Sequence, residues 1–159
     1  MRIAALAVVY ATFVIALMLE LMPLPAAVVD WRPNWVMLVL TYWVLALPHR
    51  FSIGHGWVLG LLLDVLLGAP LGLNALVLSI ISYLVAANYQ RIRTMALVQQ
   101  AFVVAALSVL CQLLHVAGEY LINGERFRPD VLQPTLPSAL LWPLLFLIMR
   151  RLRRRFLVR

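Results

Sequence analysis

The sequence has no lysine, a single cysteine and few charged residues of either sign. Charged residues make up 12% and hydrophobic residues 65% of the 159, whereas ordinary soluble domains have about 25% charged and about 45–50% apolar residues. This composition excludes a soluble fold. Cys111 lies inside an apolar run and has no second cysteine for an intrachain disulfide, so it is interpreted as a packing residue.

Motifs for catalysis or metal binding are also absent from the sequence. The three histidines are scattered and Cys111 has no thiol partner, so the usual spacing of a metal site is missing. There is no P-loop, no Rossmann glycine pattern and no nucleophile beside a base. A chain of 159 residues holds at most about six or seven membrane crossings, which leaves no room for a soluble catalytic domain. We expect a protein that is not an enzyme and uses no cofactor or metal.

Six apolar runs predict six transmembrane helices, because about 20 apolar residues cross the hydrocarbon core. Charges, prolines and glycines separate the runs, which lie near residues 3–22, 32–47, 51–67, 71–88, 95–118 and 135–149. A basic tail, residues 150–159, follows the last run. The first run is longer than the core of a secretory signal, so we interpret it as a membrane helix. The sequence thus predicts an all-α membrane bundle in one transmembrane domain, residues 1–159.

The arginines are distributed unevenly between the two sides of this bundle. Ten of the 13 fall at the chain ends and in the loops of one side, and five of the six acidic residues fall on the other side. Arginines are retained in the cytoplasm, so we expect both termini there. The net charge of +7 lies beside apolar runs and fits an anionic membrane surface rather than nucleic acid. Anionic lipid headgroups are the expected contacts of Arg150, Arg151, Arg153, Arg154 and Arg155.

A four-residue repeat of small residues marks the third run. Gly56, Gly60, Asp64, Gly68 and Gly72 recur at this spacing, and the first three share one helix face. Small residues at this spacing let helix backbones approach closely. Three interpretations stay open: an internal packing seam with Asp64 hydrogen-bonded to a neighbouring helix, a seam that also receives a partner's helix, or a ligand or proton site.

Polar residues inside the predicted membrane segments gather towards the outer side. On the fifth run, four of them form one stripe: Ser108, Gln112, His115 and Glu119. The helical rise gives polar residues of four different runs a similar depth, in the outer half of the membrane. We therefore expect an outward-facing polar cavity lined by Glu20, Asp64, Asn74, His115 and Glu119. In the plainer interpretation, His115 makes one hydrogen bond at headgroup level and Glu119 is a solvated end residue.

The first half of the chain carries an ordered set of motifs. In chain order they are Pro33-Asn34-Trp35, Tyr42-Trp43, Pro48-His49-Arg50-Phe51-Ser52-Ile53-Gly54, Trp57, Gly60-Leu61-Leu62-Leu63-Asp64-Val65, Gly68 and Leu71-Gly72. This combination resembles the family of bacterial rod shape-determining proteins MreD. The chain length, the number of apolar runs and the basic tail are similar to that family as well.

The resemblance implies a non-enzymatic, multi-pass inner-membrane subunit of the machinery that builds lateral peptidoglycan in rod-shaped bacteria. It implies a direct partner, MreC, which has one membrane helix and a large periplasmic part. It also implies indirect links to the actin-like MreB and to the RodA glycosyltransferase with its transpeptidase. The implied fold is like that of the substrate-binding subunits of energy-coupling-factor transporters. We expect the helix-packing and partner interface at Gly56, Trp57, Gly60, Asp64 and Gly68.

Two other function classes stay open. A small-molecule binding or transport subunit would use the outward polar cavity, with a site centred on Asp64 and His115. Against it, the sequence lacks the paired broken helices of many transporters. A proton channel would need a polar route to the cytoplasm, and the inner halves of the runs offer little beyond Gln99, Gln100 and Ser79.

Overall fold

The computed structural model describes residues 3–124 and 126–156 of the chain. Within these ranges the regular elements are seven α-helices and two short 3-10 helices, with no β-strand. The all-α class predicted from the sequence is confirmed for this part of the chain. Arg2, Glu125 and Arg159, which entered the charge count above, lie outside the described residues.

Each of the six apolar runs contains one long helix. These helices are α1 (Ile3–Leu21), α2 (Trp35–Ala46), α3 (Ile53–Leu67), α4 (Leu73–Ala87), α6 (Leu97–Asn123) and α7 (Thr135–Arg155). The short helix α5 (Tyr89–Thr94) was not predicted, because it is too short and too polar to show an apolar pattern. Two 3-10 helices, η1 (Val29–Trp31) and η2 (Pro129–Leu132), lie in the connections before α2 and before α7.

Two helices extend beyond the predicted ranges. Helix α6 continues from residue 118 to Asn123 and ends at Gly124, which has a left-handed conformation with φ +69°. Helix α7 continues from residue 149 to Arg155, so the first part of the predicted basic tail is helical. Arginine has a high helix propensity, which explains why this charged segment prolongs the helix instead of ending it.

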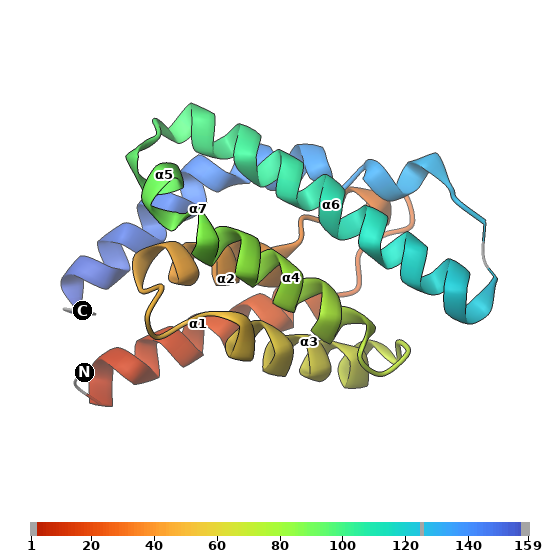
Figure 1. The fold of residues 1–159 in the computed structure, drawn as a ribbon, viewed down its shortest axis with the longest axis horizontal. Helices are drawn as coiled ribbons and strands as arrows, with labels where there is room; N and C mark the ends of the chain where they lie inside the picture. Colours follow the sequence, from red (N-terminus) through yellow and green to blue (C-terminus); the bar gives the residue numbers. More distant parts are fainter. Residues whose placement is uncertain (1–2, 125, 157–159) are drawn as a thin grey trace.

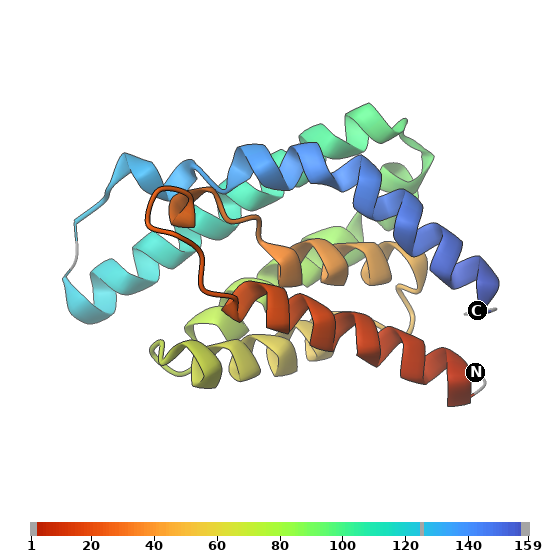
Figure 2. The ribbon, with the colours of Figure 1, turned by 180° about the vertical axis from the view of Figure 1, so that it is seen from behind.

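Figures 1 and 2 show both chain ends at one end of the bundle and the α3–α4 turn at the other, which we call the distal end. Helices α3 and α4 pack as an antiparallel hairpin, and α6 and α7 form a second antiparallel pair. Helix α2 contacts α1, α4 and α7. Its residues 36–45 are all buried, as is typical of a helix that is apolar on every side.

Three helical segments are long and apolar enough to cross a membrane: Ile3–Leu21, Leu97–Asn123 and Pro129–Arg155. Helices α3 and α4 are apolar too, but each has only 15 residues. Large apolar side chains are exposed on the outer surface; for example, Val65, Leu121 and Leu140 are 68%, 82% and 77% exposed. Such a surface fits contact with lipid chains rather than with water.

Candidate functional site

Helices α3 and α4 pack with their backbones in contact. A Cβ atom on Gly60 would lie 2.3 Å from the Cα of Ala75, and one on Gly56 would lie 2.7 Å from the carbonyl oxygen of Leu78. Both distances are shorter than real Cβ contacts, so only glycine fits here at this helix spacing. The two glycines therefore set the distance between α3 and α4.

Asp64 lies at the distal end of this seam and is 1% exposed. Its carboxylate accepts hydrogen bonds from the backbone N–H groups of Gly72 (2.8 Å), Asn74 (2.9 Å) and Ala75 (3.4 Å). It also accepts one from the side-chain amide of Asn74 (2.9 Å). The first N–H groups of a helix have no acceptor within the helix. Asp64 supplies acceptors at the start of α4, which is an internal packing role.

The structure places the three other residues of the predicted interface in different surroundings. Trp57 is 52% exposed and outside the seam, because it follows Gly56 by one position and each residue turns a helix by about 100°. Gly68 ends α3 in a left-handed conformation (φ +64°), and a Cβ there would meet no atom within 4 Å. Asp64 is enclosed by the protein's own atoms, so the seam does not present it to another chain.

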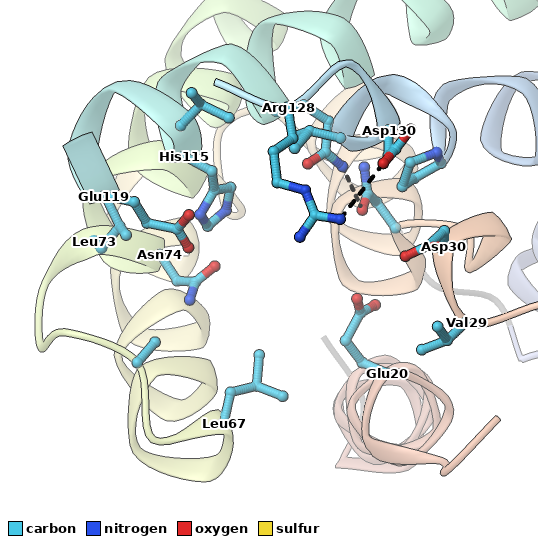
Figure 3. A pocket seen from close by; sticks show the side chains of 16 residues that line it. Glu20, Val29, Asp30, Leu67, Leu73, Asn74, His115, Glu119, Arg128 and Asp130 are labelled. Carbon is cyan, nitrogen blue, oxygen red and sulfur yellow. Dashed lines mark hydrogen bonds and ion pairs between the residues drawn. The ribbon is translucent and has the colours of Figure 1, made fainter. Parts of the chain in front are cut away.

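A polar pocket of about 570 Å³ opens at the distal end of the bundle. Four of the five residues expected to line an outward cavity do line it: Glu20, Asn74, His115 and Glu119. In Figure 3, Asn74, His115 and Glu119 lie on one side of the opening, and Glu20 lies on the other. Asp64 does not line it, because its carboxylate binds the start of α4 behind Asn74.

Asn34, directly before α2, lines this pocket and joins three helices. Its backbone N–H donates to Ser138 Oγ (3.1 Å) on α7, and its side-chain amide donates to Ser108 Oγ (3.0 Å) on α6. Its Oδ1 accepts a hydrogen bond from Gln112 Nε2 (3.2 Å), also on α6. Two residues of the predicted polar stripe thus hold α6 against α2, and the two further along the stripe line the pocket.

Acidic side chains outnumber basic ones among the described residues around the pocket. Carboxylates come from Glu20, Asp30, Glu119 and Asp130, and a guanidinium comes from Arg128. Arg128 lies 3.6 Å from Asp130, and both side chains are exposed. Within the described ranges, no three His, Cys, Asp or Glu side chains are placed to hold a metal ion. The pocket therefore offers acceptors to a cationic or N–H-bearing group.

A second cavity, an apolar groove of about 380 Å³, lies between α1 and α7. Its lining residues are Thr12, Ile15, Ala16, Leu19, Trp35, Val39, Leu141, Leu144, Leu145, Ile148, Met149 and Leu152. The hydroxyl of Thr12 already donates to the carbonyl oxygen of Val9 (2.6 Å) and accepts from Trp43 Nε1 (2.9 Å). The groove therefore offers mainly apolar surface.

The groove and the pocket adjoin at two places in the chain. At the end of α1, Leu19 lines the groove and Glu20 lines the pocket. At the start of α2, Trp35 lines the groove and Asn34 lines the pocket. An apolar surface along the side of the bundle therefore leads to a polar opening at its distal end.

Comparison with known proteins identifies the family to which this chain belongs. The family model of the rod shape-determining protein MreD matches residues 1–152. A curated rod shape-determining protein MreD from Haemophilus influenzae is 41% identical over 143 residues, which are 90% of this chain and 88% of that protein. The chain belongs to the MreD family. The family resemblance seen in the motifs is thereby confirmed, and MreD proteins are shape-determining proteins, not known enzymes.

No solved structure matches this MreD-family chain. Several residues of the pocket were not expected from the sequence. Asn34 belongs to the Pro33-Asn34-Trp35 motif of the MreD resemblance, which was not used to predict a pocket residue. Asp30, Arg128 and Asp130 were counted only among the charges of the loops, because no periodic pattern gives the direction of a side chain in a loop.

Proposed function

We propose that this chain is a multi-pass subunit of the bacterial inner membrane that supports lateral peptidoglycan synthesis by binding MreC. Membership of the MreD family carries the proposal, because the family and the curated relative are named for rod shape determination. The chain would act as a clamp that holds the membrane helix of MreC. The periplasmic part of MreC then meets RodA and its transpeptidase, and MreB is linked indirectly.

We propose that α1, α2, α3, α4, α6 and α7 cross the membrane as one domain with both termini in the cytoplasm. The chain ends lie at one end of the bundle (Figure 1), as do the arginines of α5 and α7. The described carboxylates lie towards the distal end. Retention of arginine in the cytoplasm then favours a periplasmic distal end.

Three of these helices are shorter than the hydrocarbon core is thick. The 12 residues of α2 rise about 18 Å and the 15 residues of α3 or α4 about 22 Å, whereas the hydrocarbon thickness is about 30 Å. Loop residues and local thinning of the bilayer are the expected compensation. The proposed likeness to the substrate-binding subunits of energy-coupling-factor transporters rests on the family resemblance.

We assign the MreC helix to the apolar groove between α1 and α7. Along α7 the groove extends from Leu141 to Leu152, about 16 Å of helical rise and about half of the hydrocarbon core. The seam between α3 and α4 is unsuitable, because α4 already covers its glycines. A helix in the groove leaves the membrane beside the polar pocket, where Glu20 and Asp30 can accept hydrogen bonds from the following segment.

The test is co-purification of MreC with the tagged, full-length chain in mild detergent. Ile148 lines the groove and is 55% exposed, so Ile148→Trp fills the groove without entering the core. Leu147, the next residue, is 43% exposed and does not line the groove, which makes Leu147→Trp the matched control. We expect Ile148→Trp to lower MreC recovery several-fold and Leu147→Trp to leave it unchanged. Equal recovery with both variants would remove the groove from the MreC interface.

A small-molecule binding subunit is the second candidate function. The polar pocket of about 570 Å³ favours it, because ligand pockets usually measure about 300–1,000 Å³. This function predicts a metabolite that stays bound through purification and is lost in His115→Leu. A bound metabolite without MreC in the purified sample would favour this candidate over the clamp.

A further inference from the structure

A third cavity, of about 220 Å³, lies between α2, α5, α6 and α7. Figure 1 shows α5 and the C-terminal part of α7, which contribute to its lining, at the end of the bundle that holds the chain termini. Its floor includes the buried Tyr42 and Gln100, and its rim carries Arg93, Arg150 and Arg153. The three arginines come from two helices that are far apart in the sequence, α5 and α7.

Buried hydrogen bonds fix the helices that carry these arginines. Gln100 is 3% exposed, and its Nε2 donates to the carbonyl oxygens of Ile92 (3.1 Å) and Met95 (3.3 Å), on either side of Arg93. Its Oε1 accepts from Trp142 Nε1 (3.3 Å) on α7. One side chain of α6 thus ties both α5 and α7, so the cavity is part of the packed bundle and not of a loose tail.

The three arginines are gathered without a carboxylate beside them. None of the described residues that line the cavity is acidic, and the described carboxylates lie towards the distal end. Three guanidinium groups around so small a cavity repel one another. An anion in the cavity relieves this repulsion and accepts charge-assisted hydrogen bonds from them.

We propose that Arg93, Arg150 and Arg153 bind the phosphate group of an anionic membrane lipid in this cavity. The planar guanidinium group matches phosphate oxygens in a bidentate geometry, and the Tyr42 hydroxyl supplies a further donor in the lining. The site is more specific than a general attraction of the basic tail to headgroups, because it needs Arg93 of α5. It also lies on a different face of α7 from the groove, so it does not rest on MreC binding.

The surface that leads to the cavity favours a lipid over a soluble phosphate. Leu140 and Leu147 on α7 do not line the groove and are 77% and 43% exposed. Their spacing of seven residues puts them on one helix face, and Leu147 lies one turn before Arg150. An acyl chain along this face places its headgroup phosphate at the arginines.

The experiment is a titration of the full-length protein, in detergent, with dioleoyl-phosphatidylglycerol, followed by native mass spectrometry. Dioleoyl-phosphatidylcholine is the headgroup control, and sodium phosphate is the soluble competitor. Arg93→Gln is compared with Arg91→Gln, which removes the same charge from the same helix but does not touch the cavity. Arg153→Gln is compared in the same way with Arg155→Gln on α7.

We expect Arg93→Gln and Arg153→Gln each to weaken phosphatidylglycerol binding about tenfold, and their controls to weaken it about twofold or less. Phosphatidylcholine binding stays weak throughout. Similar losses in all four variants would show a diffuse attraction and overturn the site. Displacement of the lipid by equimolar sodium phosphate would show that the ligand is a soluble phosphate. If Arg93→Gln lowers the melting temperature of the protein without lipid, the comparison of Arg153→Gln with Arg155→Gln tests the site instead.

Discussion

Gly60→Ala tests how closely α3 and α4 are packed. The added Cβ would lie 2.3 Å from the Cα of Ala75 and 2.4 Å from its nitrogen. Ordinary contact begins at 3.4 Å, so the helices must separate by about 1 Å. Backbone atoms cannot relieve the clash by changing rotamer as a side chain can. We therefore take the upper end, about 3 kcal/mol, of the usual cost of overpacking. Alanine regains about 1 kcal/mol of helix propensity, so the net loss of stability is about 2 kcal/mol.

The assay is reversible unfolding of the full chain in mixed micelles, followed by circular dichroism. Gly54→Ala is the matched control, because Gly54 lies on the same helix and a Cβ there would meet nothing within 4 Å. We expect Gly54→Ala to be at least as stable as the parent chain. If Gly60→Ala unfolds at the same denaturant concentration as Gly54→Ala, the backbone contact between α3 and α4 is refuted.

Three further predictions concern the distal end. Asp64→Leu leaves three N–H groups of α4 and its preceding turn without an acceptor. In the same unfolding assay it should lower stability by about 2–4 kcal/mol, which is more than the loss in Asp64→Asn. Asn34→Leu removes both side-chain hydrogen bonds to α6 and should lower the free energy of unfolding by about 2 kcal/mol. An unchanged midpoint of the unfolding transition would count against these hydrogen bonds. In a Cys111→Ser background, which has no other cysteine, His115→Cys should react with a membrane-impermeant maleimide added from the periplasm, and Asp64→Cys should not. Labelling at position 64 without labelling at position 115 would contradict the proposed pocket.

Hydrophobicity along the chain was sufficient to locate the six long helices. Each is a run of apolar residues between charges or helix-breaking residues, and the structure keeps these limits within a few residues for α1 to α4. It could not predict α5 or the helical arginines of α7, because polar helices carry no apolar pattern. The α1–α7 groove was also beyond prediction. In a chain that is apolar on most faces, composition does not tell a face that meets a helix from one that meets lipid.

The sequence predicted the position of the polar pocket along the helices, but not all of the residues that line it. Helical rise alone gave Glu20 and His115 the same depth, and both line the pocket. Asp64 has that depth too, but the turn that follows α3 folds back and uses its carboxylate. Asn34 was missed because its partner Ser108 is 74 residues away, and no local pattern shows a contact at that separation.

Photo-crosslinking in living cells tests MreC binding in the α1–α7 groove most directly. A benzoylphenylalanine is placed at Ile148 in the groove or at Val65, which is 68% exposed on α3 and does not line the groove. We predict a crosslink to MreC from Ile148 and none from Val65. A crosslink from Val65 and none from Ile148 would put MreC on the α3 side of the bundle and contradict the proposed clamp.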